Sequence, residues 1–154
     1  MRFLLDEMLA RLARLLRAAG YDVDLSQGGE RDAAMAARAR EEARVLVTRD
    51  RELAAAASPG SVLLTDDDPH AQARALSAVL PIDWQLAPFS RCVMDNARLR
   101  PAMPEEIARM PADSRAGPGP FRACPACGRL YWPGSHVKRM GAKLHDLAQD
   151  PPQA

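Results

Sequence analysis

Apolar and polar residues follow two different periods along the first 80 residues of the chain. Short apolar or alternating runs predict strands, and runs with apolar residues three and four positions apart predict helices. The predicted strands are residues 2–5, 21–25, 44–48 and 61–65. The predicted helices are residues 8–19, 32–43, 52–57 and 69–80. Strands that alternate with helices predict an α/β fold with a parallel sheet and flanking helices.

The pattern changes after Pro81, where most of the 13 prolines lie and regular periodicity nearly vanishes. A short helix at residues 104–110 and a loop at residues 116–120 are all that we predict there. We therefore expect two units and a tail. These are an α/β domain over residues 1–84, a small irregular module over residues 85–147, and a frayed tail over residues 148–154.

Several aspartates follow the predicted strands directly. Asp6 and Asp50 end two strands, residues 66–68 follow a third, and Asp32 opens a helix expected to start on the same side. Parallel sheets place ligands at the carboxyl ends of their strands. Carboxylates there suit Mg²⁺ or Mn²⁺, and two such ions can activate water beside a phosphodiester. Aspartate is also a preferred helix N-cap, so the residues by themselves leave both interpretations open.

Charge is distributed unevenly. Residues 1–87 hold 11 basic and 14 acidic residues, whereas residues 88–145 hold 10 basic and 4 acidic ones. This difference suits metal binding in the first part and contact with a polyanion in the second, or it reflects two solvated surfaces. No lysine lies in residues 1–137, which excludes a P-loop or Schiff-base lysine there and disfavours a phosphatase or phosphoacceptor.

The apolar run at residues 3–5 is too short for a secretory signal, and no stretch approaches the ~20 apolar residues of a membrane span. Only three cysteines occur, which fits a reducing compartment better than a disulfide framework. We therefore expect a cytoplasmic protein without membrane contact. The sequence permits a homo-oligomer.

Two pairs of residues with the same spacing suggest a zinc ribbon. Cys124 and Cys127 form one Cys-x-x-Cys pair, and Cys92 with Asp95 forms the other. Zinc accepts carboxylate, so these four side chains could bind Zn²⁺, with His136 as an alternative fourth ligand. A metal-free ribbon that rests on aromatic packing is the other interpretation.

Three sequence blocks, in this order, resemble one known family. They are residues 1–22 (MRFLLDEMLARLARLLRAAGYD), residues 47–51 (VTRDR), and the Cys-rich end with residues 124–128 (CPACG) and 131–136 (YWPGSH). Together they resemble the PIN-like ribonuclease family of the Mut-C RNase type, which carries cysteine where this chain has Asp95. The likeness spans nearly the whole chain.

The resemblance implies a PIN-like domain followed by a zinc-ribbon-like module. It also implies hydrolysis of phosphodiester bonds in single-stranded RNA, with Asp6, Asp32 and Asp50 as the catalytic residues that hold Mg²⁺ or Mn²⁺. Asp66 and Asp67 are the candidates for a fourth acid. The alternative is a non-catalytic PIN-like module that binds RNA or a protein.

Five basic residues are the predicted substrate-binding residues. Arg14, Arg17 and Arg49 lie in the family-like blocks, where guanidinium groups could hold a phosphate. Lys138 and Arg139 lie in a basic segment interleaved with aromatic rings, a composition that suits single-stranded nucleic acid. A solvated helix face and loop charges are the simpler interpretation of the same residues.

Overall fold

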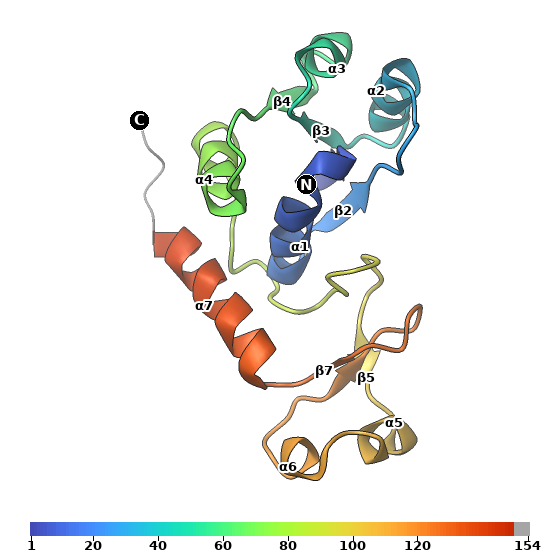
Figure 1. The fold of residues 1–154 in the computed structure, drawn as a ribbon, viewed down its shortest axis with the longest axis vertical. Coiled ribbons are helices and arrows are strands. Elements are labelled where there is room, and N and C mark those ends of the chain that lie inside the picture. Colours follow the sequence, from blue (N-terminus) through green and yellow to red (C-terminus); the bar gives the residue numbers. More distant parts are fainter. Residues whose placement is uncertain (150–154) are drawn as a thin grey trace.

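The structure is a computed structural model that describes residues 1–149 (Figure 1). Its first part is an α/β unit built on four parallel strands in the order β2-β1-β3-β4. The predicted alternation of strands and helices is therefore confirmed. The strands are β1 (Arg2–Leu5), β2 (Asp22–Leu25), β3 (Val45–Thr48) and β4 (Ser61–Leu63). The helices are the 3₁₀ turn η1 (Glu7–Leu9), α1 (Ala10–Ala19), α2 (Asp32–Glu41), α3 (Arg51–Ala56) and α4 (Pro69–Val79).

The two faces of the sheet are covered by different helices. Phe3 and Leu5 point into a core cluster with α1 and α4, and Leu4 points into a second cluster with α2 and α3. This alternation follows from the two-residue period of a strand, and both faces are apolar because both are buried. Gly20, with a φ of 106°, ends α1 in the left-handed region. A Cβ there would lie 2.6 Å from the carbonyl oxygen of Ala87, so glycine is required for both reasons.

The strand order creates a switch point between β1 and β3. The chain leaves β1 toward β2 on one side and then crosses to β3 on the other side of β1. The helices after these two strands, α1 and α3, therefore lie on opposite faces. A crevice forms at the carboxyl ends of two such strands, and it is the usual ligand position in open α/β sheets.

The second part is built around a small antiparallel sheet. Its strands are β5 (Arg100–Pro101), β6 (Arg122–Ala123) and β7 (Leu130–Tyr131), in the order β5-β6-β7. Two short helices, α5 (Pro104–Ala108) and α6 (Ala112–Arg115), connect β5 to β6. Figure 1 shows this sheet with its two helices set apart from the four-stranded sheet, beyond the end of α1.

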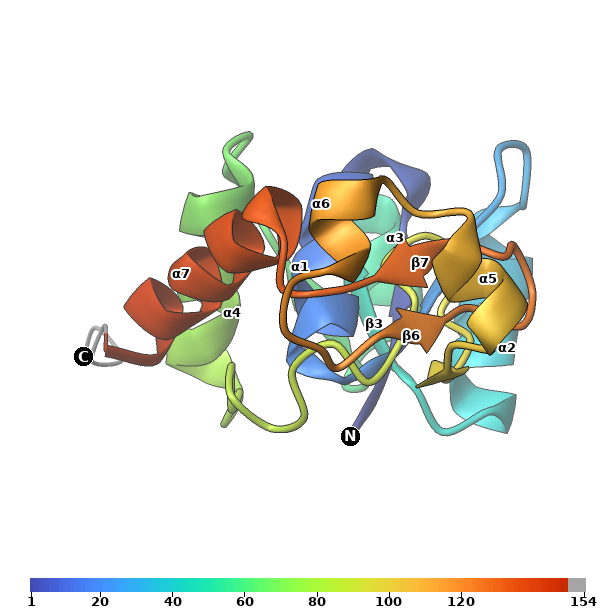
Figure 2. The same cartoon turned by 90° about the horizontal axis from the view of Figure 1, so that it is seen from below.

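A long final helix, α7 (Ser135–Gln149), corrects the expectation that regular structure ends before it. It packs against α1 and α4, as Figure 2 shows. Val137, Met140, Leu144 and Leu147 recur three or four residues apart and join the larger core cluster. This is the helical period, which the prolines before it obscured in the sequence. Of the tail predicted at residues 148–154, the first two residues end α7, and residues 150–154 lie outside the described part.

The larger core cluster runs through both parts of the chain. It contains Phe3, Leu16 and Trp84 from residues 1–84, and Cys92 and Leu144 from the residues that follow. The predicted boundary between two domains at residue 84 stays a prediction. Both parts of the chain contribute to one apolar core. Within residues 1–149, none of the helices combines the length and the apolar character that crossing a bilayer would require.

Candidate functional site

Two of the predicted aspartates lie at the switch point and are joined by one threonine. Asp6 follows β1, and its backbone N–H donates to the carbonyl oxygen of Val47 at 3.1 Å. Thr48 ends β3 and is fully buried. Its hydroxyl donates to Oδ2 of Asp6 at 3.1 Å and accepts from the backbone N–H of Asp50 at 3.0 Å. Asp6 and Asp50 therefore belong to one hydrogen-bonded unit.

Asp50 also caps α3. Its Oδ1 accepts the backbone N–H groups of Glu52 at 2.7 Å and Leu53 at 3.1 Å. The helix-cap interpretation of Asp50 is thus realised, but it uses only one carboxylate oxygen. Within residues 1–149, Oδ2 of Asp50 and Oδ1 of Asp6 accept no hydrogen bond. These two oxygens remain open to a cation.

The other predicted acids lie on the same edge of the sheet. Asp32 is the first residue of α2 and is exposed; Arg31, not Asp32, is the N-cap residue. Asp66 and Asp67 follow β4, and both are exposed. Within the described chain, none of these acids, nor Asp6 or Asp50, belongs to a group of three or more ligating side chains within 4.8 Å of one another.

Arg49 lies between Thr48 and Asp50 and contacts the acidic run, which is residues 66–68. Its guanidinium forms an ion pair with Oδ1 of Asp67, with an Nη2–Oδ1 distance of 2.5 Å. Its Nε is buried and has no hydrogen-bond partner within the described residues. An orphaned buried donor is costly and is normally satisfied by water or a ligand. Arg49 therefore has one donor free at the predicted site.

Arg17 corrects the expectation that it holds a phosphate. Its side chain is 5% exposed. Nε donates to the carbonyl oxygen of Val23 at 3.0 Å, and Nη1 donates to those of Met94 at 2.5 Å and Val93 at 3.3 Å. Arg17 thus ties α1 and β2 to the segment between Cys92 and Asp95. Arg14, one turn earlier, is exposed.

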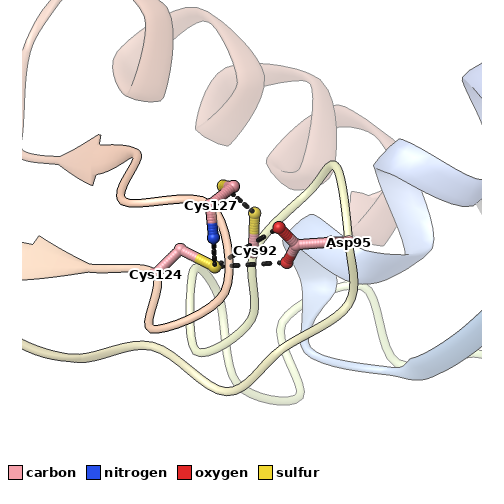
Figure 3. Close-up of side chains that lie close together, drawn as sticks. All are labelled: Cys92, Asp95, Cys124 and Cys127. Carbon is pink, nitrogen blue, oxygen red and sulfur yellow. Dashed lines mark hydrogen bonds between the residues drawn. The ribbon is translucent and has the colours of Figure 1, made fainter.

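The clearest ligand cluster lies in the second part (Figure 3). Cys92, Asp95, Cys124 and Cys127 bring one ligand atom each to within 4.8 Å of the others. The Sγ atoms of Cys92 and Cys127 are 3.8 Å apart, and Sγ of Cys124 is 3.2 Å from Oδ1 of Asp95. Tetrahedral zinc with Zn–S bonds of ~2.3 Å places two sulfurs about 3.8 Å apart. The spacing of the donor atoms therefore fits zinc.

Without a cation, this cluster carries its negative charge on the carboxylate and keeps protons on its thiols. Although desolvation opposes it, hydrogen bonds from the three thiols and from Ala97 lower the pKa of Asp95 to about 2. Burial, helped by the hydrogen bond with Asp95, raises the pKa of the Cys124 thiol to about 12. Asp95 and burial also raise the pKa of Cys127. A divalent cation reverses this balance, because it stabilises thiolates directly.

The backbone around the cluster supports it. The N–H of Cys127 donates to Sγ of Cys124 at 3.5 Å, and Gly128 follows with a φ of 70°. The hydroxyl of Tyr131 donates to Sγ of Cys92 at 3.2 Å and accepts the N–H of Val93 at 3.0 Å. Such outer contacts orient metal ligands. His136 lies on α7 and is not part of the cluster, so Asp95 is the fourth donor.

Two of the five basic residues predicted to bind the substrate lie on α7. Lys138 and Arg139 are both exposed, one turn or less from the start of the helix. Arg139 lines a cavity between α7 and α1 together with Arg14, whereas Lys138 does not line it. The structure thus brings Arg14 and Arg139 together.

Thr48 joins the two aspartates, although the sequence pattern gave it no role. A threonine two residues before an aspartate at the end of a buried strand was visible in the sequence. Its bond to Asp6 was not, since it depends on β1 and β3 being neighbours.

The chain was compared with known proteins. The family model of the Mut7-C RNAse domain matches residues 1–144. No curated protein and no solved structure matches the chain.

Proposed function

The chain belongs to the Mut7-C RNAse domain family, and from this premise we propose that it is a metal-dependent ribonuclease acting on single-stranded RNA. The family match supports a nuclease role, with RNA as the substrate. The observation that carries the proposal is the pair of aspartates at the β1/β3 switch point, linked through Thr48. A strand order of this kind places ligands where these carboxylates lie.

Asp6 and Asp50 are suited to hold a hard divalent cation. Each keeps one carboxylate oxygen free of hydrogen bonds within the described residues, and each is fixed through its other oxygen. Mg²⁺ or Mn²⁺ bound there would supply a Lewis acid and an acidified water for phosphodiester hydrolysis. Asp32, at the start of the neighbouring α2, is the proposed third acid. Few protein ligands suffice, since Mg²⁺ retains several waters.

Arg49 is proposed to hold the phosphate beside this pair. The orphaned Nε supports the proposal, because a phosphate oxygen would satisfy it. Asp67 now pairs with the same guanidinium but is 87% exposed, so an incoming phosphate could replace it at little cost. The residue would then bind and orient the substrate without taking part in proton transfer.

The second cluster is proposed to be a structural zinc site. Three sulfurs and one carboxylate leave no open position in a tetrahedral site, which is the arrangement of a structural rather than a catalytic zinc. Cys92 and Asp95 come from one turn, and Cys124 and Cys127 come from the turn between β6 and β7. Zinc would therefore fasten two segments that are about 30 residues apart in the sequence.

The proposal is tested by cleavage of labelled, unstructured RNA with zinc-loaded protein, in the presence and absence of Mn²⁺. The variants Asp6→Asn and Asp50→Asn are informative because asparagine keeps the acceptor for Thr48 and the helix cap while it removes the charge. Asp113→Asn, an exposed acid on α6, is the matched control. We expect Mn²⁺-dependent cleavage in wild type and control, and its loss in both site variants.

A non-catalytic RNA-binding module is the second candidate. It is favoured by the absence, within residues 1–149, of a close group of three acids around Asp6 and Asp50. Under this alternative, wild type and both variants leave several RNAs intact with Mn²⁺ or Mg²⁺, yet bind them. That result would reduce Asp50 to a helix cap.

A further inference from the structure

A cavity of about 260 Å³ lies between α1, α7 and the start of α4. Arg11 and Arg14 line it from α1, and His136, Arg139 and Lys143 line it from α7. We call it the α1/α7 cleft. Figure 2 shows the two helices side by side. Positions 11 and 14 share one face of α1, and positions 136, 139 and 143 share one face of α7. The two basic faces therefore meet across the cleft.

Within residues 1–149, the basic side chains of the α1/α7 cleft have no hydrogen-bond or ion-pair partner. No acidic residue lines the cleft. The hydrogen bond from the Ala71 N–H is the largest cause that lowers the pKa of Asp68, and the charge of the nearby Arg11 is a smaller one. The carboxylate of Asp68, however, is engaged in capping α4 through Oδ2.

Some arginines outside the α1/α7 cleft do form ion pairs. Arg38, Arg44, Arg49 and Arg100 each form an ion pair with at least one carboxylate. Like charges that face each other across a cavity repel, so the three arginines and the lysine that line it are unfavourable together in the free protein. A bound anion removes the repulsion. Two arginines from α1 and an arginine and a lysine from α7 line one cavity that no acidic residue lines, and this arrangement suits an anionic ligand.

The position of the α1/α7 cleft favours RNA over a small anion. One end lies at the start of α4, directly after the acidic run, and Arg11 is in the first turn of α1, five residues after Asp6. At the other end, His136 also lines a second cavity of about 320 Å³ that includes Arg129 and the half-buried Trp132. A charged path beside an aromatic ring is the usual surface for single-stranded nucleic acid.

We propose that the α1/α7 cleft binds the phosphate backbone of single-stranded RNA, with Arg11, Arg14, Arg139 and Lys143 on the phosphates and a base beside Trp132. This inference deepens the proposed function, since it supplies the path by which a strand reaches the aspartates. It adds Arg11, Lys143 and His136 to the five predicted substrate-binding residues. It does not require that the protein cut the RNA.

The experiment measures RNA binding separately from cleavage. Fluorescence anisotropy follows a labelled oligouridine on the full, zinc-loaded chain carrying Asp6→Asn, without added Mg²⁺ or Mn²⁺, and a gel checks that the RNA stays intact. The test pair is Arg11→Gln with Lys143→Gln. The matched control pair is Arg31→Gln with Arg98→Gln, two exposed arginines outside the α1/α7 cleft with the same change in charge. Thermal unfolding verifies that both variants fold.

We expect the test pair to bind RNA about tenfold more weakly, from about threefold for each exposed ionic contact. The slope of log affinity against log salt should fall by about 1.4, at about 0.7 for each lost phosphate contact. The control pair should keep both values. Equal losses in the two pairs, or an unchanged slope, would overturn the proposal. So would a polyglutamate peptide that competes as well as RNA, because it would point to an acidic protein partner.

The two proposals fail in distinguishable ways. If the protein cuts RNA but binds it equally well with and without Arg11 and Lys143, the nuclease proposal stands and the proposal for the α1/α7 cleft fails. If the protein cuts no RNA but the test pair shows the expected loss of RNA affinity, the proposal for the cleft stands and the nuclease proposal fails.

Discussion

Replacing the buried Arg17 by methionine tests the structural role of this residue against the phosphate-binding role that its sequence context suggests. Methionine keeps an unbranched apolar stem of similar length but removes the guanidinium. The carbonyl oxygens of Val23, Val93 and Met94 then lose their donor. No water can replace it freely, because the side chain is only 5% exposed.

The magnitude follows from the three contacts. The bonds to Val23 at 3.0 Å and Met94 at 2.5 Å are the two short ones, and the bond to Val93 at 3.3 Å is weak. Hydrogen bonds from a charged donor contribute about 1.5–3 kcal/mol each, so two good ones give about 3–6 kcal/mol. Part of this is offset, since burial lowers the pKa of Arg17 and thus opposes its charged form. We expect a net loss of about 2–4 kcal/mol, a large share of the stability of a typical domain.

The assay is urea unfolding followed by far-UV circular dichroism, at one fixed excess of zinc so that metal linkage is equal in all samples. Arg14→Met is the matched control, because Arg14 lies on the same helix and is exposed. A surface substitution of this kind should change stability by no more than about 0.5 kcal/mol. Zinc affinity should also fall in Arg17→Met, about tenfold or more, since Val93 and Met94 lie between Cys92 and Asp95.

One result would refute this reasoning. If Arg17→Met unfolds at the same urea concentration as wild type but binds RNA more weakly, Arg17 contacts substrate and its buried position is wrong. Arg14→Met serves as the reference for this outcome, because it is expected to keep the stability of the wild type and to bind RNA more weakly.

Two further predictions concern the zinc cluster and the acid stability of the fold. Asp95→Cys should bind Zn²⁺ at least about tenfold more tightly than Asp95→Asn in competition with a chromophoric chelator, because a thiolate replaces the carboxylate whereas an amide is a weak ligand. Desolvation by burial acts to raise the pKa of Asp22. Hydrogen bonds from Arg44 and Asn96 outweigh this effect and lower the pKa. Its contribution is therefore present above about pH 4 and is lost as the pH falls through the lowered value, so thermal unfolding of Asp22→Asn should depend less on pH over this range.

The α/β alternation and the four side chains of the metal cluster could be predicted from the sequence alone. Strand and helix periods are local, so the runs at Phe3 and Leu46 could be assigned before any contact was known. The two pairs Cys92–Asp95 and Cys124–Cys127 each fix their own spacing within one turn. Because a zinc ribbon needs two such turns, local information was enough to name these four side chains, while His136 stayed an alternative until the structure placed it outside the cluster.

Helix α7 shows where local reading failed through composition. Its apolar residues have a clear helical period, but the prolines up to Pro133 and the basic residues around Lys138 led to the prediction of an irregular, RNA-binding segment. What stabilises the helix is the packing of Leu144 and Leu147 into the core that α1 also contributes to. Tertiary packing of one face is the usual source of helical stability, and it is invisible in the local sequence.

What the sequence determined by itself was the type of each element and the chemistry each one carries. Only the tertiary structure decided the strand order that brings Asp6 and Asp50 together through Thr48, the burial of Arg17, and the meeting of α1 with α7 across an unpaired basic cleft. Each of these joins segments that are tens of residues apart in the chain. Their position is set by which apolar faces bury one another, and the hydrophobic effect that drives this burial is non-directional and acts on the whole fold at once.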